Sequence, residues 1–175
     1  MELAIAPPPK IAAGVTLQIP IVVTFSTTTT PGDEKQESQG AHEPVVLPDL
    51  SGVWAIVSLT TPDMEQSLAP PRTDLLRGRT ADSIHPINEE QDGERRTLAY
   101  ATFSDIVITE PGQYRLKVNI IDMNSAFLGE SEGAPTVLPC LHSEVFDVAE
   151  GIEHAICETK VQETLSRLRS IGVNF

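Results

Sequence analysis

Two cysteines and two histidines are the residues of this sequence whose types are best suited to metal chemistry. Cys140 and His142 lie one residue apart, and His154 and Cys157 follow in the same part of the chain. Thiolate sulfur and imidazole nitrogen are the ligands that zinc prefers. Their spacing matches no common zinc motif, so the sequence favours reduced thiols and surface histidines. We therefore expect neither a metal nor a cofactor.

Catalytic motifs are missing from the sequence. It contains no Gly-x-Ser-x-Gly nucleophile motif and no recognisable Cys/His signature. Gly112 is isolated and precedes an expected strand, which excludes a phosphate-binding glycine loop. Carboxylates are so numerous that pairs of them indicate little. The sequence assigns no catalytic residue and favours a protein that is not an enzyme.

The chain is strongly acidic. Twelve Lys and Arg residues stand against 25 Asp and Glu residues, which gives a formal net charge of -13. Such a charge repels phosphate backbones. Residues 118 to 159 contain acids but neither Lys nor Arg: Asp122, Glu130, Glu132, Glu144, Asp147, Glu150, Glu153 and Glu158. A solvated face is the favoured interpretation of this run, with an acidic docking surface as the alternative.

A few positive side chains are the candidates for nucleic-acid or partner contacts. They are Lys10, Arg72, Arg77, Arg79, Arg95, Arg96 and Arg115. Arg115 follows Tyr114 on the outward side of an expected strand, where a solvated arginine paired with a neighbouring acid is the favoured alternative. The same alternative is favoured for the others.

Length and composition indicate one domain over residues 1–175. Two cysteines form at most one disulfide, unlike the dense framework of small secreted domains. The N-terminus lacks a signal-peptide pattern, no apolar run is long enough to span a membrane, and no basic cluster resembles a nuclear import signal. We expect an intracellular protein without a membrane anchor, in the cytoplasm, the nucleus or both.

Short β-branched runs punctuated by Pro and Gly predict a mainly β protein. Strands are expected at residues 3–5, 17–25, 52–59, 98–108, 113–122 and 145–148, with a short strand pair within 75–84. Strict alternation from Gln113 to Ile120 makes the strand at 113–122 the clearest, and Trp54 is expected in the core or at its rim. Pro111 and Gly112 predict a type II turn. Flexible loops are expected at 27–47 and 86–96.

The period of the apolar residues changes near the C-terminus. Val161, Leu165, Leu168 and Ile171 recur at spacings of three and four residues, and Gly172 follows as a stop signal. This pattern predicts one amphipathic helix from Thr159 to Ile171, packed on the strands.

The order of several short motifs resembles the fungal velvet domain. They are Leu76-x-Gly78, Phe103-Ser-Asp105 and the run Pro111-Gly112-Gln113-Tyr114-Arg115-Leu116. The opening LAIAPPPKIAAGVTLQIPIVV, the segment SEVFDV, and Thr164–Arg167 followed by Gly172-Val173 resemble the ends of that domain. The resemblance implies an immunoglobulin-like (Rel-homology-like) β-sandwich with a C-terminal helix. It also implies a regulator of fungal development and secondary metabolism that forms homodimers or heterodimers with another velvet protein and binds DNA.

One part of the family pattern is missing. Velvet proteins usually carry a basic run after the first strand, whereas this chain has Ala12-Ala13-Gly14-Val15 with only Lys10 nearby. Non-specific DNA affinity depends on cations that neutralise phosphates, so we expect weak or no DNA binding by the protein alone. The favoured function is a velvet-like regulatory and interaction module that acts through dimerisation. The alternative is a diverged velvet-fold protein that binds a small molecule or is an enzyme of fungal secondary metabolism.

Overall fold

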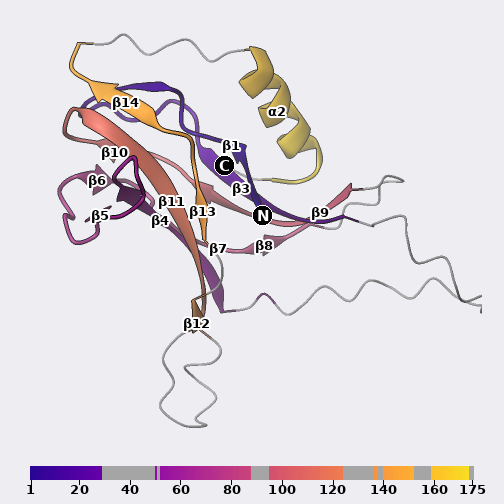
Figure 1. Ribbon diagram of the computed structural model, residues 1–175. Coiled ribbons are helices and arrows are strands. Elements are labelled where there is room, and N and C mark those ends of the chain that lie inside the picture. Colours follow the sequence, from indigo (N-terminus) through magenta and orange to yellow (C-terminus); the bar gives the residue numbers. More distant parts are fainter. Residues whose placement is uncertain are drawn as a thin grey trace, which may run out of the picture.

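The protein is mainly β, with a single helix near the C-terminus in the part of the chain that the structure describes (Figure 1). The structure is a computed structural model. It describes residues 1–28, 50, 52–87, 95–123, 136–137, 140–151 and 159–173. In these residues, no helix is long and apolar enough to cross a membrane. The predicted mainly β class with a C-terminal helix is confirmed.

The strands are short, apart from β3, β4, β9 and β11. In chain order the elements are β1 (Glu2–Ile5), β2 (Lys10–Ala12), β3 (Ile21–Thr28), β4 (Val53–Thr60), β5 (Ser67–Ala69), β6 (Leu76–Arg77), β7 (Ala81–Ser83), β8 (His85–Pro86), β9 (Arg95–Phe103), β10 (Val107–Ile108), β11 (Gly112–Asp122), β12 (Thr136–Val137), β13 (Leu141–His142), β14 (Phe146–Ala149) and helix α2 (Thr159–Ser170).

The strands that the structure describes form two main sheets and one two-stranded ribbon. The large sheet has the order β2-β14-β11-β4-β5, with β12 and β13 paired to β11 and β7 paired to β4. The small sheet has the order β1-β3-β9-β8, and β6 pairs with β10 in the ribbon. Strand β1 lies at an edge, as predicted from the prolines that follow it.

Strands β4 and β11 form the longest pairing of the large sheet. Eight residues of each strand are paired antiparallel, from Arg115 opposite Thr60 to Asp122 opposite Val53. Alternate residues point to opposite faces of a sheet. Tyr114, Leu116, Val118 and Ile120 are buried, which confirms the predicted alternation.

The main core lies between the two sheets. The buried side chains of β4 and β11 belong to one cluster with those of β3 and β9, including Val23, Ala101 and the fully buried Phe103. Burying one side chain of this size contributes about 1.5–3 kcal/mol relative to leaving it exposed. The inner faces therefore hold the two sheets together.

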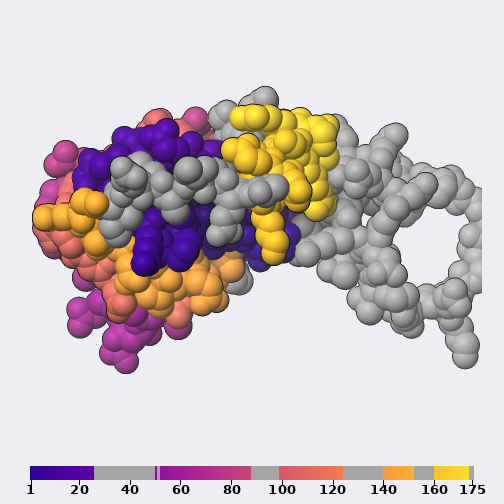
Figure 2. Space-filling view, turned by 90° about the horizontal axis from the view of Figure 1, so that it is seen from above, coloured from indigo at the N-terminus to yellow at the C-terminus, as the bar shows by residue number. Residues whose placement is uncertain are grey.

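A second core lies on the other face of the small sheet, beneath helix α2. Leu165 and Leu168 of the helix are buried with Val22 of β3, Tyr100 of β9 and Val173 after the helix. Figure 2 shows α2 on the surface beside the N-terminal strands. The helix ends at Ser170, one residue before the predicted end, and the Val173 amide donates to the Leu168 carbonyl at 3.0 Å.

A buried carboxylate links the two sheets. Asp82 of β7 in the large sheet accepts hydrogen bonds at Oδ2 from the amide (2.9 Å) and hydroxyl (3.4 Å) of Thr102 in β9 of the small sheet. Its Oδ1 accepts from Arg79 at 2.8 Å and contacts His85 Nε2 at 3.4 Å. Because a buried carboxylate is stabilised by several donors, Asp82 fixes how β7 and β9 pack.

The predicted strand pair within residues 75–84 is wrong in its pairing. Strand β6 pairs with β10 in the ribbon, β7 pairs with β4 in the large sheet, and β8 pairs with β9 in the small sheet. The chain passes from the large sheet to the small one at Ile84, which is buried in the core. Periodicity in a sequence does not specify which strands pair.

Two further strand boundaries differ from the prediction. The strand expected from residue 17 begins at Ile21, after Pro20, which has no amide hydrogen to donate; Leu17 instead donates to the Ile106 carbonyl at 2.8 Å. The strand expected at 98–108 is divided into β9 and β10, because Asp105 has a left-handed backbone with φ of 57°. Aspartate tolerates this conformation.

The described ends of the segments predicted as flexible loops, 27–47 and 86–96, are strand residues instead. Residues 27–28 lie in β3, Pro86 lies in β8, and residues 95–96 lie in β9. Backbone pairing of Thr27 with Arg96 extends β3 and β9 beyond the apolar run that predicted them. Residues 29–47 and 88–94 lie outside the described residues.

The predicted type II turn at Pro111 and Gly112 is also wrong. The φ of Gly112 is 159°, which is nearly extended, and Gly112 is the first residue of β11. A Cβ at this position would lie 2.8 Å from the Tyr114 hydroxyl. The glycine therefore leaves room for the tyrosine side chain, which a turn motif alone does not indicate.

Gly78 provides a test of how the ribbon packs on the end of β9. Its φ is 106°, and a Cβ there would lie 2.1 Å from the Asp105 carbonyl oxygen. We predict that Gly78→Ala lowers the free energy of unfolding by about 2–4 kcal/mol, through backbone strain and overlap. Urea unfolding at neutral pH measures this change.

Gly14→Ala is the matched control. Gly14 also has a positive φ (72°), but a Cβ there would meet nothing within 4 Å. Gly14→Ala should lower the free energy of unfolding by only about 1 kcal/mol, because alanine is strained in the left-handed conformation. Equal losses for the two variants would contradict the close approach of Gly78 to Asp105.

Candidate functional site

The residues suggested for a zinc site are not brought together among the described residues. Cys140 is exposed and free. Within the described ranges, no group of His, Cys, Asp and Glu side chains is arranged to hold a metal ion. His154 and Cys157 lie outside those ranges. The expectation of no metal or cofactor stays a prediction.

The predicted basic contact residues lie in several separate places. Arg79 donates its amide to the carbonyl of Ser104, just beyond the end of β9, whereas Arg95 and Arg96 lie at the start of β9. Nine residues of strand at about 3.3 Å each separate these ends by roughly 30 Å. Figure 1 shows β6, which contains Arg77, on the side of the molecule away from the start of β9. They do not form one basic patch.

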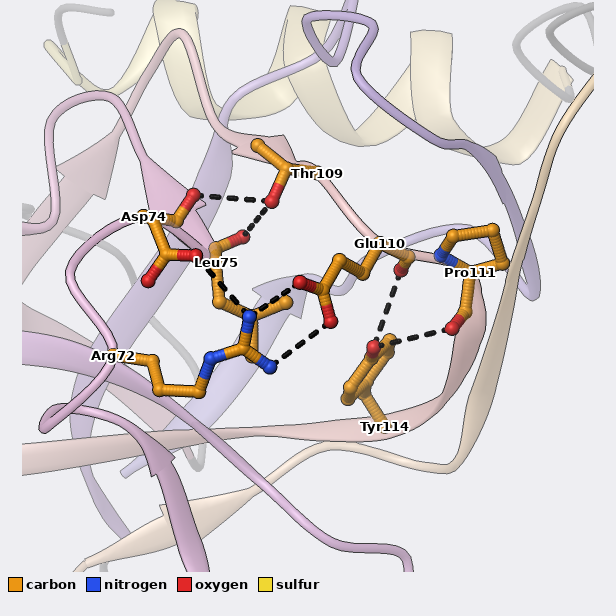
Figure 3. Close-up of polar contacts among 7 residues, drawn as sticks. All are labelled: Arg72, Asp74, Leu75, Thr109, Glu110, Pro111 and Tyr114. Atoms are coloured by element: carbon orange, nitrogen blue, oxygen red, sulfur yellow. Dashed lines mark hydrogen bonds and ion pairs between the residues drawn. The ribbon is translucent and has the colours of Figure 1, made fainter.

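Arg72 is held by two carboxylates of the protein itself (Figure 3). Its Nη1 donates to Glu110 Oε2 at 2.9 Å, and its Nη2 contacts both Glu110 Oε1 and Asp74 Oδ2, the latter at 3.1 Å. This fork geometry matches a carboxylate well. The charge of Arg72 is compensated, so the residue is a poor phosphate ligand.

The acids around Arg72 respond to its charge. Hydrogen bonds from Arg72 hold the pKa of Glu110 below its usual value. For Asp74, a backbone hydrogen bond lowers the pKa first, and the hydrogen bond from Arg72 lowers it further. Arg77, which is exposed in β6, adds a smaller effect in the same direction on Asp74. Both carboxylates therefore stay ionised to lower pH than usual.

Two other predicted contact residues have different surroundings. Arg79 pairs with the buried Asp82 at 2.8 Å and so belongs to the link between the sheets. Lys10 is exposed at the start of β2, opposite Asp147 of β14. Asp147 accepts a hydrogen bond from Gln113 Nε2 at 2.8 Å. Lys10 therefore lies on an edge strand of the large sheet, whereas Arg77 lies in the two-stranded ribbon.

Arg115 lies on the outer face of the large sheet, as predicted, but its partners are carbonyl groups. Nε donates to the Pro62 carbonyl at 2.8 Å and Nη1 to the Ser143 carbonyl at 2.7 Å. These acceptors fix the guanidinium without neutralising it. Lys117 shares this face two residues later, opposite His142 of β13.

The charges of Arg115 and Lys117 act on His142. Burial first, and then the positive charges of Lys117 and Arg115, lower the pKa of the imidazole from its ordinary value. Among the described residues, Lys117 takes part in no ion pair. We call Arg115, Lys117 and His142 the basic end of the outer face.

The other end of the same face is apolar. Trp54 of β4 is 43% exposed, which shows that its predicted place in or at the rim of the core is wrong. It pairs across the sheet with Ile121 of β11, and Ile56 follows on the same side, opposite Ala81 of β7. We call Trp54, Ile56, Ala81 and Ile121 the apolar end. Trp54 and Ala81 are exposed, and Ile56 and Ile121 are half-buried. A contiguous apolar group at the surface is typical of an interaction surface.

Sequence reasoning missed Trp54 as a surface residue, and it did not place Lys117 and His142 on the same face as Trp54. The signal was present in the alternation: Trp54 and Ile56 have the parity opposite to Val53 and Ala55, which are buried. An all-apolar strand hides this parity because both of its faces look suitable for a core. Only the pairing with β11 assigns the faces.

Two grooves flank helix α2. One, of about 290 Å³, lies between the helix and strands β1 and β3, and is lined by Glu2, Thr24 and Arg167 among others. The other, of about 350 Å³, lies between the helix, residues 17–20 and the turn at Ser104 and Asp105. Both are open, unlike the enclosed apolar cavities that hold most small-molecule ligands.

Comparison with models of known protein families gives no match for the chain, and no curated protein matches it either. The velvet resemblance therefore stays a prediction from the sequence.

Arg72→Gln tests whether Arg72 is committed to the protein's own carboxylates. We predict that the substitution raises the pKa of Glu110 toward its usual value of 4.5, because the hydrogen bonds that favour the ionised form are lost. The sign of the effect on stability follows from the lowered pKa. The Glu110 ion pair stabilises the folded protein at pH values above 4.5, and this stabilisation is lost as the pH falls through the lowered pKa of Glu110. Carbon-detected NMR titration of the Glu110 carboxyl measures the change. An unchanged midpoint would contradict the ion pair.

Proposed function

We propose that the protein is a velvet-like interaction module, which acts by associating with another protein and binds DNA weakly or not at all by itself. The observation that carries this proposal is the apolar end of the outer face of the large sheet, where Trp54 is 43% exposed, Ile121 lies opposite it and Ile56 follows on the same side. The small sheet, by contrast, has its outer face covered by α2. Aromatic side chains of this kind are frequent anchors in protein interfaces.

A hydrogen bond at the start of β11 supports an immunoglobulin-like sandwich as the finer fold. The Tyr114 hydroxyl donates to the Glu110 carbonyl at 3.1 Å, four residues upstream (Figure 3). Such a tyrosine corner is a hallmark of immunoglobulin-like sandwiches. It lies within the run from Pro111 to Leu116 that resembles the velvet domain, so it supports both parts of the proposal.

Electrostatics argue against DNA binding by the protein alone. Arg72 and Arg79 are paired with carboxylates, and the net charge of the chain is -13. Each phosphate contact requires an uncompensated cation, and non-specific affinity rises with the number of such contacts. We predict no retardation of duplex DNA in mobility-shift titrations at low salt. Retardation at micromolar protein would contradict this part of the proposal.

The association itself is tested by affinity capture from a fungal lysate. We predict that wild-type protein retains a specific partner and that Trp54→Thr loses it, because the apolar anchor is removed while the β propensity of the strand is kept. Val15→Thr is the matched control, since Val15 is similarly exposed (41%) but lies in the segment after β2. Retention by the Trp54 variant equal to that of wild type would contradict the proposal.

A further inference from the structure

We infer that the outer face of the large sheet binds an acidic, amphipathic protein segment, with its apolar side chains on the apolar end and its carboxylates on the basic end. This inference rests on the proposed function as an interaction module and specifies the chemistry of the partner. It follows from three properties of the face: the order of its residues, its charge and its size.

The order of residues along β11 divides the face in two. Arg115, Lys117, Asn119 and Ile121 follow one another on the outward side, and Thr60, Ser58, Ile56 and Trp54 lie opposite them on β4. Thr60 and Ser58 are themselves buried, so the partly exposed side chains of this strand pair at the Arg115 end are those of β11. The face therefore changes from charged to apolar along a single strand direction. A partner that matches both ends must be polarised in the same way.

The basic end is a local exception in an acidic protein. The Arg115 guanidinium donates to two neutral carbonyl oxygens, and Lys117 has no ion pair among the described residues. Positive charges left uncompensated at the edge of an apolar patch favour an acidic partner and disfavour a basic one. Arg72 and Arg79, which are already paired, offer no such selectivity.

The size of the face suits a short segment better than a second copy of the chain. At most, eight paired residues extend over roughly 26 Å and four strands about 4.8 Å apart give a width of roughly 19 Å, and Ser58 and Thr60 within this rectangle are buried. The resulting area of roughly 500 Å² is well below the about 800 Å² per partner of a standard interface.

Symmetry also opposes self-association through this face. A two-fold axis in the plane of contact and parallel to the strands would place Arg115 and Lys117 of one copy over the same residues of the other. An axis perpendicular to the strands would place these cations over Trp54 and Ile121. The first arrangement repels and the second desolvates charge without compensation.

Synthetic peptides test the chemistry directly. One peptide has an apolar half of Leu and Val and a half of Glu, and a second carries Lys in place of Glu. Trp54 is the sole tryptophan, so its fluorescence reports binding at the apolar end. We expect the acidic peptide to bind and the basic one not to bind. Equal binding of both peptides, or binding of neither, would overturn the inference.

Variants separate the two ends. Lys117→Glu should weaken binding of the acidic peptide about tenfold or more, whereas Lys160→Glu, the same charge change on helix α2, should leave it unchanged. If the two variants weakened binding equally, the preference for the acidic peptide would depend on the net charge of the protein. That result would contradict the assignment of the carboxylates to the basic end. Circular dichroism and urea unfolding check that both variants are folded.

Affinity capture distinguishes failure of this inference from failure of the proposed function. Loss of the captured partner with both Trp54→Thr and Lys117→Glu supports both. If Trp54→Thr loses the captured partner but Lys117→Glu retains it, the proposed interaction module is supported and the acidic partner is refuted. Sedimentation of the protein alone should show a monomer, and a dimer abolished by Trp54→Thr would assign the face to a second copy instead.

Discussion

The antiparallel pairing of β4 with β11 is the constraint on which the rest of the structure depends. Its register decides which side chains of both strands face inward, because a slip by one residue would exchange the two faces. In the observed register, Leu116, Val118 and Ile120 are buried with Val57 and Leu59. The same register leaves Trp54 and Ile121 outside. The core and the proposed interaction surface are therefore two consequences of one pairing.

The two sheets differ in how their outer faces are covered. Helix α2 places Leu165 and Leu168 on the outer face of the small sheet, and a second core results. The large sheet carries no comparable cover from the described residues, and its outward side chains change from basic to apolar along β11. This asymmetry leaves Trp54 and Ile121 outside both cores, on the face where we propose that a partner binds.

The motifs that predicted the family resemblance serve mainly to pack the chain. Gly78 lies against the Asp105 backbone, so two motifs that are distant in the sequence meet at the end of β9. The Tyr114 hydroxyl donates a hydrogen bond to the Glu110 carbonyl and so fixes the segment before β11 against the strand. Periodicity was sufficient to predict β11 and the helix, since each has a clear repeat. It could not predict the partners of β6, β7 and β8 or the exposure of Trp54, because these depend on contacts between distant strands.

The sole tryptophan makes the central claim directly measurable. Acrylamide quenching of Trp54 fluorescence reports whether the indole is accessible to solvent, first in the isolated protein and then with the captured partner bound. The structure predicts efficient quenching in the isolated protein, since Trp54 is 43% exposed, and strong protection in the complex. A tryptophan that is protected in the isolated protein, or equally quenched with the partner bound, would contradict an interaction surface on the outer face of the large sheet.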